Sequence, residues 1–375
     1  MKLGVLAQML AVSVAAMPMF AGWGARAEVP RVDAPISHDG VSIYLLKGKS
    51  QPGPVPLTLA EALAKGAIEV HETGRVQELK IENKGSEAVF VQLGDIVKGG
   101  RQDRVLTVSM LLKPNSGLVP IGAYCVEQGR WSARGIEDAR KFATSDALLP
   151  SREAKVAIAK PASTATPGVA DPQARSPIEA ELNNVRQREA QQAIGQRSSN
   201  LGGRTDSQSE VWKNVGVLQG LLSSNLASPV ASERSRTSLQ LSLENEALKS
   251  AQAAYVAALE PAGLKDDDVV GVAIAIGGRV TSADLYPSNG LFRKMWPKIL
   301  RAAATEAIAL KDQGAKPAPA VATVAAFLAD GDKGIRSERR LGALTSLETQ
   351  DSDKVLSVRA SVPKGDLVHR SYLAK

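Results

Sequence analysis

Two short segments concentrate polar side chains of the kind that recognise anions. The first, Lys98-Gly-Gly-Arg101, places two glycines between basic side chains. Glycines allow backbone N–H groups to turn toward an anion, and arginine offers a two-pronged fork for phosphate or carboxylate. The alternative is a tight connection between two strands whose basic side chains are solvated. The segment is not a nucleotide-binding P-loop, because the Gly-x4-Gly-Lys-Ser/Thr spacing is absent.

The second segment, Glu127-Gln-Gly-Arg-Trp131, brings an acid, an amide, a guanidinium and an indole together within five residues. Such a cluster after a strand is typical of a site for a polar ligand. The alternative is a structural role, in which Arg130 pairs with Glu127 or Asp95 and Trp131 covers the core. If the two segments converge, the candidate ligand-binding residues are Lys98, Arg101, Gln102, Arg104, Glu127, Gln128, Arg130 and Trp131.

Three carboxylates are candidates for acid–base chemistry. Asp95, Glu127 and Asp284 could supply the paired acids that hydrolysis requires. Their spacing does not bring any two of them together, so structural pairing with arginine is the simpler interpretation. His369 is interpreted as a satisfied surface or strand histidine rather than as a general base. The sequence assigns no catalytic residue and predicts no cofactor.

Cysteine and histidine usage predicts neither an intramolecular disulfide nor a metal centre. Cys125 is the only cysteine and lies in the apolar stretch Val119–Val126, which favours a buried and inert thiol over a nucleophile or an intermolecular bridge. The three histidines, His38, His71 and His369, are widely separated and lack the spacing of zinc ligands.

The overall charge is basic but diffuse. The formal net charge is +7, and aromatic residues make up only 4% of the chain. A nucleic-acid interface would show clustered lysine and arginine with interleaved aromatics, so no nucleic-acid partner is expected. The charge is compatible with a mild attraction for small anions.

The first 27 residues have the pattern of an export signal. Lys2 is followed by the apolar run Leu3–Phe20 and by the small-x-small sequence Ala25-Arg26-Ala27. This pattern predicts cleavage between Ala27 and Glu28 and a periplasmic or secreted mature protein with no stable membrane span. The alternative is a retained anchor, since the apolar run could nearly cross a bilayer.

The remaining sequence divides into two structured parts around an insertion. Residues 28–145 read as rich in β-strands, with one helix capped by Thr58 and Glu61 and stopped by Gly66. Residues 146–206 are rich in Ala, Pro, Ser, Gln and Arg and are interpreted as a low-complexity insertion or linker. Residues 207–375 contain both helices and strands.

Short apolar runs define the expected elements. The strands of the first part are 41–46, 68–70, 76–82, 88–93, 104–112 and 117–126, with a hairpin turn at Glu82–Gly85. The second part predicts helices near 207–222, 239–259 and 289–311, a hairpin with a Gly277-Gly278 turn, and strands near 340–347, 354–362 and 366–373. Strand groups alternate with groups of helices, so we expect an α+β fold with antiparallel sheets.

Four stretches resemble a known domain family. They are Leu93–Arg104, Cys125–Trp131, Arg279–Tyr286 and Leu291–Lys298. These stretches are similar to the uncharacterised family named for its association with ADP-ribosylglycohydrolases and rhodanese-phosphatases. The similarity covers roughly residues 57–131 and 209–310, with a weaker match at Val368-His369.

The chain departs from that family in two places. The family usually shows a Lys-Gln-Asn-Arg type of sequence where this chain has Arg101-Gln102-Asp103-Arg104. The long insertion is the second departure. The family name implies a link to ADP-ribose or NAD chemistry through genomic association.

Three functional hypotheses follow. The first is an exported, non-enzymatic binding domain for a small anionic or nucleotide-like ligand. The second is a hydrolase of phosphate-containing or ADP-ribose-like substrates that uses Asp95 or Glu127. The third is an envelope scaffold whose insertion engages partners that the sequence does not identify.

Overall fold

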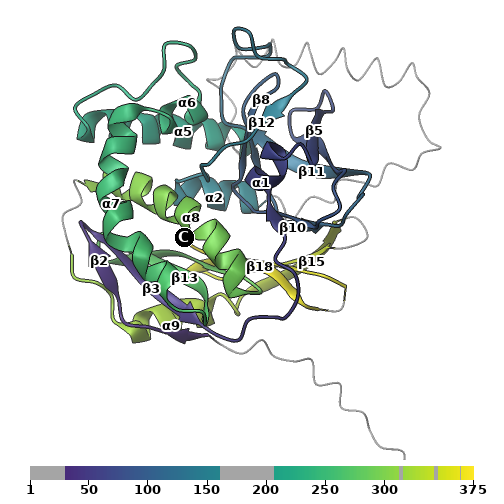
Figure 1. Cartoon of the computed structure of the whole chain (residues 1–375). Helices are drawn as coiled ribbons and strands as arrows, with labels where there is room; N and C mark the ends of the chain where they lie inside the picture. Colours follow the sequence, from purple (N-terminus) through teal and green to yellow (C-terminus); the bar gives the residue numbers. More distant parts are fainter. Residues whose placement is uncertain (1–29, 161–206, 312–315, 342–344, 364) are drawn as a thin grey trace, which may run out of the picture.

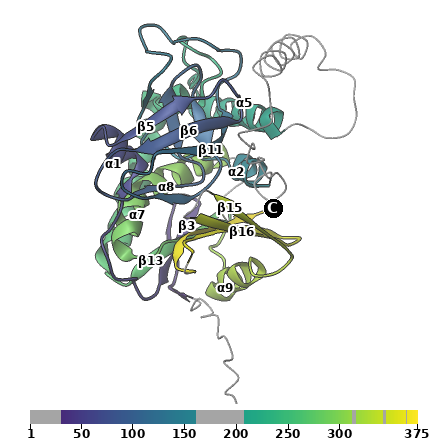
Figure 2. The ribbon, with the colours of Figure 1, turned by 90° about the vertical axis from the view of Figure 1, so that its right-hand side faces the viewer.

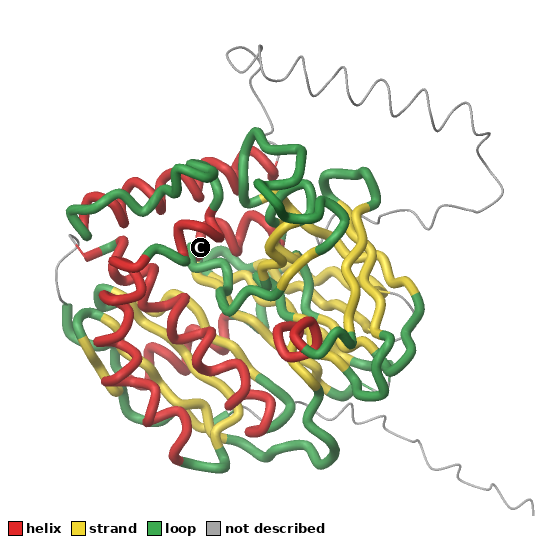
Figure 3. The backbone as a smooth tube through the Cα atoms, turned by 45° about the horizontal axis from the view of Figure 1, so that its top comes forward, coloured by secondary structure: helices red, strands yellow, loops and turns green. Residues whose placement is uncertain are grey.

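The structured part of the chain folds as the sequence predicts, into an α+β domain. The computed structural model describes residues 30–160, 207–311, 316–341, 345–363 and 365–375. In Figure 3 the strands form two groups, and most of the helices pack against or between them. The predicted signal peptide, 1–27, lies outside the described residues, as does the stretch 161–206 of the predicted insertion.

The larger group is an antiparallel sheet that unites the two ends of the chain (Figure 1). Its order is β1-β3-β13-β14-β18-β17-β16-β15, with β2 paired to β3. Because β3 from the first part pairs directly with β13 from the second, the two parts share one sheet. The strands are β1 (Arg31–Val32), β2 (Ile36–His38), β3 (Val41–Lys47), β13 (Val269–Ile276), β14 (Arg279–Leu285), β15 (Ile335–Leu341), β16 (Thr345–Asp351), β17 (Val355–Ser361) and β18 (Leu367–Ala374).

The turn between β13 and β14 confirms the predicted glycine hairpin. Gly277 and Gly278 have φ angles of 57° and 77°, in the left-handed region that glycine adopts without steric cost. At the far edge the prediction is less accurate. β15 ends at Leu341 and β16 begins at Thr345, so the predicted strand 340–347 spans the connection between two strands.

Helices cover both faces of the large sheet (Figure 2). On one face lie α8 (Asn289–Ala309) and α7 (Glu246–Lys265), which pack against each other. On the other face lies α9 (Val321–Asp330), a helix that the sequence analysis did not predict. Val324 and Leu328 of α9 join a small apolar core with Tyr44. The sheet is therefore buried on two sides along its β3 and β13 strands.

The helix predicted over 239–259 is in fact two helices. α6 (Leu239–Leu243) ends before Asn245, whose side chain caps the start of α7 by accepting from the N–H groups of residues 247 and 248. Pro261 and Gly263 were predicted to end the second helix, but α7 continues through both of them to Lys265.

The smaller β region belongs to the first part of the chain. One sheet has the order β12-β8-β9-β11-β6-β5, and a second has the order β10-β7-β4. These strands are β4 (Leu57–Thr58), β5 (Ile68–Glu72), β6 (Glu78–Asn83), β7 (Val89–Val91), β8 (Ile96–Gly99), β9 (Arg104–Leu106), β10 (Met110–Leu112), β11 (Leu118–Cys125) and β12 (Phe142–Ala143).

Two strand predictions in this region are wrong. The turn at Glu82–Gly85 does not form a hairpin, because β6 pairs with β5 and β11 while β7 pairs with β4 and β10. The Asn83 side chain bonds the carbonyls of Glu87 and Lys113 and so redirects the chain into a different sheet. The predicted strand 104–112 is also divided: β9 pairs with β11, whereas β10 pairs with β7.

Three helices complete the domain. In α1 (Leu59–Ala64) the predicted capping box is confirmed, with Thr58 and Glu61 exchanging bonds. In α5 (Ser207–Asn225) the predicted apolar positions Val211, Val215, Leu218 and Leu222 are buried. α2 (Arg152–Ala159) lies inside the stretch 146–206 assigned to the insertion, yet Ala154 and Ile158 belong to the core. The packed domain therefore extends to residue 160.

Candidate functional site

The two predicted polar segments lie side by side because of strand pairing. β8 and β9 are antiparallel, and the loop between them carries residues 100–103. β11 runs beside β9 and ends at Cys125, which delivers the second segment next to that loop. The Gln102 amide donates to the Glu127 carbonyl at 2.8 Å, and the Val126 N–H donates to the Asp103 carbonyl at 3.0 Å.

The glycine turn at the end of β8 directs its N–H groups toward the protein's own acceptors. Gly99 and Gly100 have φ angles of 108° and 57°, and a Cβ at Gly100 would overlap the Phe142 ring. The Gly99 N–H donates to Asp103 Oδ1 at 2.8 Å, and the Arg101 N–H donates to Glu72 Oε1 at 3.0 Å. The anions that this turn binds are thus internal carboxylates.

Beneath the two segments lies a buried ionic cluster. Asp103 and Glu127 are fully buried, and two arginines bridge them. Arg134 Nη1 lies 2.9 Å from Asp103 Oδ2, and Arg130 Nη2 lies 2.6 Å from Glu127 Oε2. Ser238 adds a 2.7 Å hydrogen bond to Asp103, which connects the cluster to the start of α6. Buried charges require such pairing, because an isolated ion in the interior is very costly.

This environment keeps the Glu127 carboxyl ionised. Burial acts to raise the pKa of Glu127, but the hydrogen bonds from Arg130 and Ser235 outweigh it, and the pKa is lowered from 4.5. A carboxylate that stays ionised at neutral pH is a poor proton donor. Glu127 therefore suits ion pairing better than general-acid catalysis.

Arg104 and Cys125 form a second layer of the same cluster. The Arg104 side chain is completely buried, lies against the Cys125 sulfur and forms an ion pair with Glu72 at 3.3 Å. Burial raises the pKa of the Cys125 thiol to about 12, in spite of the opposing charge of Arg104. Since the thiolate is the nucleophile, the thiol is unreactive at neutral pH. The structure thus supports the interpretation of Cys125 as buried and inert.

Above this cluster lies an exposed rim, formed by Arg101, Gln128 and Trp131. The Trp131 side chain is 38% exposed, and the guanidinium carbons of Arg101 and Arg104 lie 5.5 and 5.2 Å from its ring centroid. Arg101 and Gln128 are exposed. Among the residues that the structure describes, no carboxylate forms an ion pair with the Arg101 guanidinium. Lys98 is engaged instead with Glu244, 2.7 Å away.

Several polar atoms of the cluster have no hydrogen-bond partner among the described residues, although they are buried. They are Arg104 Nε, Arg130 Nε and Glu127 Oε1, the last of which lies 3.6 Å from Arg134. Buried polar groups are nearly always satisfied, and exceptions commonly mark bound water or a ligand site. Three such atoms lie together below Trp131, although unpaired Nε atoms also occur in other arginines of the described residues, such as Arg293 and Arg370.

The other two candidate acids lie in a separate buried cluster, between the small sheets and the large one. Asp95 pairs with Lys298 at 2.6 Å, and Asp284 lies 3.1 Å from His369 Nε2. Burial acts to raise the pKa of Asp284, but the contact with His369 prevails and lowers it. Neither acid shares a cluster with Glu127, so the paired acids of the hydrolase hypothesis do not form there.

His369 also contacts a serine, which gives a Ser–His–Asp order. Ser109 Oγ lies 2.9 Å from His369 Nδ1, and it also accepts from the Leu93 N–H. A serine nucleophile must be reachable by its substrate. Ser109 is only 2% exposed and His369 only 1%. The arrangement holds the small sheets against β18 and is consistent with a satisfied strand histidine.

A group with metal-ligand chemistry lies on the exposed face of β5 and β6. One ligand atom from each of Glu69, His71 and Glu82 lies within 4.8 Å of the others. Lys84 forms an ion pair with Glu69 at 2.7 Å, so an ammonium already occupies part of this group. Its hydrogen bond lowers the pKa of the Glu69 carboxyl.

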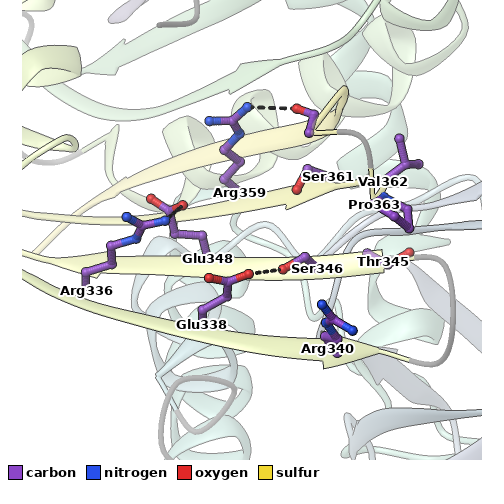
Figure 4. A pocket seen from close by; sticks show the side chains of 11 residues that line it. Arg336, Glu338, Arg340, Thr345, Ser346, Glu348, Arg359, Ser361, Val362 and Pro363 are labelled. Atoms are coloured by element: carbon purple, nitrogen blue, oxygen red, sulfur yellow. Dashed lines mark hydrogen bonds and ion pairs between the residues drawn. The ribbon is translucent and has the colours of Figure 1, made fainter. Parts of the chain in front are cut away.

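A hollow of about 310 Å³ lies elsewhere, on β15, β16 and β17 (Figure 4). The sequence gives no indication of it. Arg336 and Glu348 form an ion pair at one end of it, and Ser346 donates a hydrogen bond to Glu338. The lining residues are Arg336, Glu338, Arg340, Thr345, Ser346, Glu348, Arg359, Ser361, Val362, Pro363 and Gly365.

Four charged residues that complete the ion pairs of the site were not predicted from the sequence. They are the acids Glu72, Asp103 and Glu244 and the cation Arg134, and all four contact the site. A local signal exists only for Arg134, which pairs with Glu137 three residues later. The others come from distant parts of the chain or from a loop position without a distinctive pattern.

Comparisons with known proteins identify a family but no characterised relative. No curated protein and no solved structure matches the chain significantly. Among the described residues, no helix has both the length and the apolar character needed to cross a bilayer. The family model of the ARG and Rhodanese-Phosphatase-superfamily-associated Protein domain matches residues 30–373, which span both β regions. The chain therefore belongs to this family, as the resemblance of its motifs predicts.

Proposed function

We propose that this protein is an exported, non-enzymatic domain that binds a small anionic or nucleotide-like ligand at the rim formed by Arg101, Gln128 and Trp131. The observation that carries the proposal is the Arg101 guanidinium, which lies over an exposed indole and has no carboxylate partner among the described residues. A guanidinium in this setting can donate two parallel hydrogen bonds to a phosphate or carboxylate.

The buried cluster supports this role by holding the rim in place. The Arg101 backbone is fixed by its bond to Glu72, and Arg130 is fixed by Glu127 and by the Gly100 carbonyl at 3.1 Å. A binding group held by rigid neighbours loses less conformational entropy when its ligand arrives. The eight predicted residues therefore divide into a supporting layer and a rim that contacts the ligand.

Binding is favoured over hydrolysis by the state of the candidate groups. The pKa of Glu127 is lowered, the pKa of Cys125 is raised to about 12, and Asp95 and Asp284 lie in another cluster. None of these groups is both poised to transfer a proton at neutral pH and placed at the rim.

The proposed export rests on the N-terminal sequence. The apolar run and the Ala25-Arg26-Ala27 pattern are those of a cleaved signal peptide. The family match begins at residue 30, two residues after Glu28, so cleavage would leave the family domain intact. This agreement supports a periplasmic or secreted mature protein.

The test is calorimetric titration of the mature chain with inorganic phosphate, AMP and ADP-ribose. We expect saturable binding of at least one probe and about tenfold weaker binding in Arg101→Ala, since a charge-assisted bond contributes about 1.5–3 kcal/mol. Trp131→Ala should weaken binding by a smaller factor, because it removes the ring on which the Arg101 guanidinium rests. Arg140→Ala is the matched control, because Arg140 lies on a nearby exposed loop. Binding that is absent in the unmodified chain, or that the control weakens equally, would contradict the proposal.

A further inference from the structure

The hollow on β15–β17 owes its lining to strand register. In the antiparallel ladder Glu348 lies opposite Glu338 on one side and opposite Arg359 on the other. Arg340 lies opposite Ser346, which in turn lies opposite Ser361. Paired residues project to the same face of a sheet. Three neighbouring strands therefore present arginine, glutamate and serine side chains to a single surface.

The charges on this surface do not cancel. Three arginines face two glutamates, and Arg336 is neutralised by Glu348 at 2.8 Å. Arg340 is exposed and, within the described ranges, forms no ion pair. Arg359 donates from Nη2 to the Gly365 carbonyl at 3.1 Å, which leaves its charge without a carboxylate. The surface thus carries a net charge of +1, since Arg340 and Arg359 outnumber Glu338, whose carboxylate accepts only from Ser346 among the residues that the structure describes.

One lining group is also short of hydrogen bonds. Arg359 Nε is buried and has no partner among the described residues. Desolvated polar atoms without partners are costly, and a bound polar ligand or water relieves that cost.

Edge protection alone does not account for these features. β15 is the last strand of the sheet, and charged side chains on an edge strand commonly prevent unwanted strand pairing. That role explains why Arg336, Glu338 and Arg340 are exposed. It does not explain a hollow of about 310 Å³ whose lining includes a buried guanidinium nitrogen without a partner among the described residues.

We propose that this hollow is a second ligand site, which binds a small oxyanion carrying phosphate or carboxylate groups. Arg340 and Arg359 provide the forks, and the Arg336–Glu348 pair forms a fixed wall. Since a water molecule takes about 30 Å³ of liquid, the hollow holds the equivalent of about ten waters, enough for a ligand with two or three acidic groups. The site is independent of the rim at Trp131, which belongs to the small sheets.

The experiment uses the mature chain carrying both Arg101→Ala and Trp131→Ala, so that binding at the rim is suppressed. Pyrophosphate and citrate are titrated separately by calorimetry, which distinguishes phosphate from carboxylate ligands. We expect saturable binding of one of them with a Kd below about 1 mM. Arg340→Gln and Arg359→Gln should each weaken it about tenfold or more, in keeping with the loss of a charge-assisted bond.

Arg279→Gln serves as the control, because Arg279 is exposed on the same sheet at the β13–β14 turn and does not line the hollow. Arg340 is exposed, so its variant should fold normally, and circular dichroism verifies this. The proposal is overturned if neither probe saturates or if the control weakens binding as much as Arg340→Gln does. It is also overturned if an acidic peptide binds the same residues about a hundredfold more tightly than either small anion, since the hollow would then serve a protein partner.

Discussion

The cluster beneath Trp131 and the hollow on β15–β17 use the same residue types but balance their charges differently. Below Trp131, Asp103 and Glu127 are fully buried and each contacts two arginines. On β15–β17 the glutamates are at least partly solvent-accessible, and Arg340 and Arg359 have no carboxylate partner among the described residues. Burial forces charges to pair, whereas an open surface can retain a surplus for a ligand.

The difference separates structural from ligand-directed arginines. In the buried cluster, removal of one partner leaves an uncompensated charge in the interior, so the cost falls on stability. In the hollow and at the rim, removal of an exposed arginine leaves the interior unchanged, so the cost falls on binding. Measured stability can therefore test which group each arginine belongs to.

The largest effect is expected for Asp103→Ala. Asp103 binds Arg134, Ser238 and the Gly99 N–H, so its loss removes the closest carboxylate from a buried cation and the acceptor from two donors. We expect the free energy of unfolding to fall by about 3–5 kcal/mol. Urea unfolding followed by circular dichroism measures it.

Asp146→Ala is the control for that experiment, because Asp146 is an exposed aspartate in the same half of the chain. Its effect should stay within about 0.5 kcal/mol. A loss below about 1 kcal/mol in Asp103→Ala would mean that the cluster is not a structural support. Its arginines could then not be separated from the ligand-directed arginines by their effect on stability.

Glu306 contrasts with Asp103, because it is a buried acid without an ion pair among the described residues. Glu306 of α8 is buried and, in the described part of the chain, lacks an ion-pair partner. Burial raises its pKa from 4.5 to about 7, although Lys155 and the Arg152 N–H oppose the shift. Between these two pH values the folded protein holds a proton that the unfolded chain has released. The contribution of Glu306 to the free energy of unfolding is thus fully present below about pH 4.5 and is lost as the pH rises to about 7.

The corresponding prediction concerns Glu306→Gln. At pH 8 the folded protein must keep a buried carboxylate, and the amide removes that cost. We therefore expect the effect of the substitution on the free energy of unfolding to be about 3 kcal/mol more favourable at pH 8 than at pH 4. This figure follows from the size of the pKa shift at about 1.36 kcal/mol per pKa unit. Denaturant unfolding at both pH values measures the gain, with exposed Glu233→Gln as the control. An effect that is equal at the two pH values would show that Glu306 does not carry a raised pKa.

Local sequence patterns predicted much of the fold. Alternation and glycine turns located β3, β13 and β14, and the Thr58–Glu61 capping box located α1. The errors arose where distant contacts overrode a local pattern. Asn83 looked like a hairpin residue, but its bonds to residues 87 and 113 send the chain into another sheet. The bond to Lys113 spans thirty residues, so a local window around Asn83 does not reveal it.

The candidate site was predicted in position but not in charge state. The sequence identified both segments, and strand pairing does bring Gln102 to Glu127 and Arg101 to Trp131. It could not indicate that Glu72 and Glu244 neutralise neighbouring bases, because these acids are far away in the sequence. The hollow on β15–β17 was missed for a related reason, since its lining depends on the register of three strands.

The smallest effect is expected for the exposed arginines, and it completes the comparison. Arg101→Ala and Arg340→Ala should each change the free energy of unfolding by less than about 0.5 kcal/mol, because neither side chain forms an ion pair among the described residues. Arg134→Ala, in the same experiment, should destabilise the protein by several times that amount, since it leaves Asp103 buried without its closest cation. Thermal and urea unfolding measure all three variants under one buffer condition. If Arg101→Ala costs as much as Arg134→Ala, the rim belongs to the structural cluster, and its arginine is not available to a ligand.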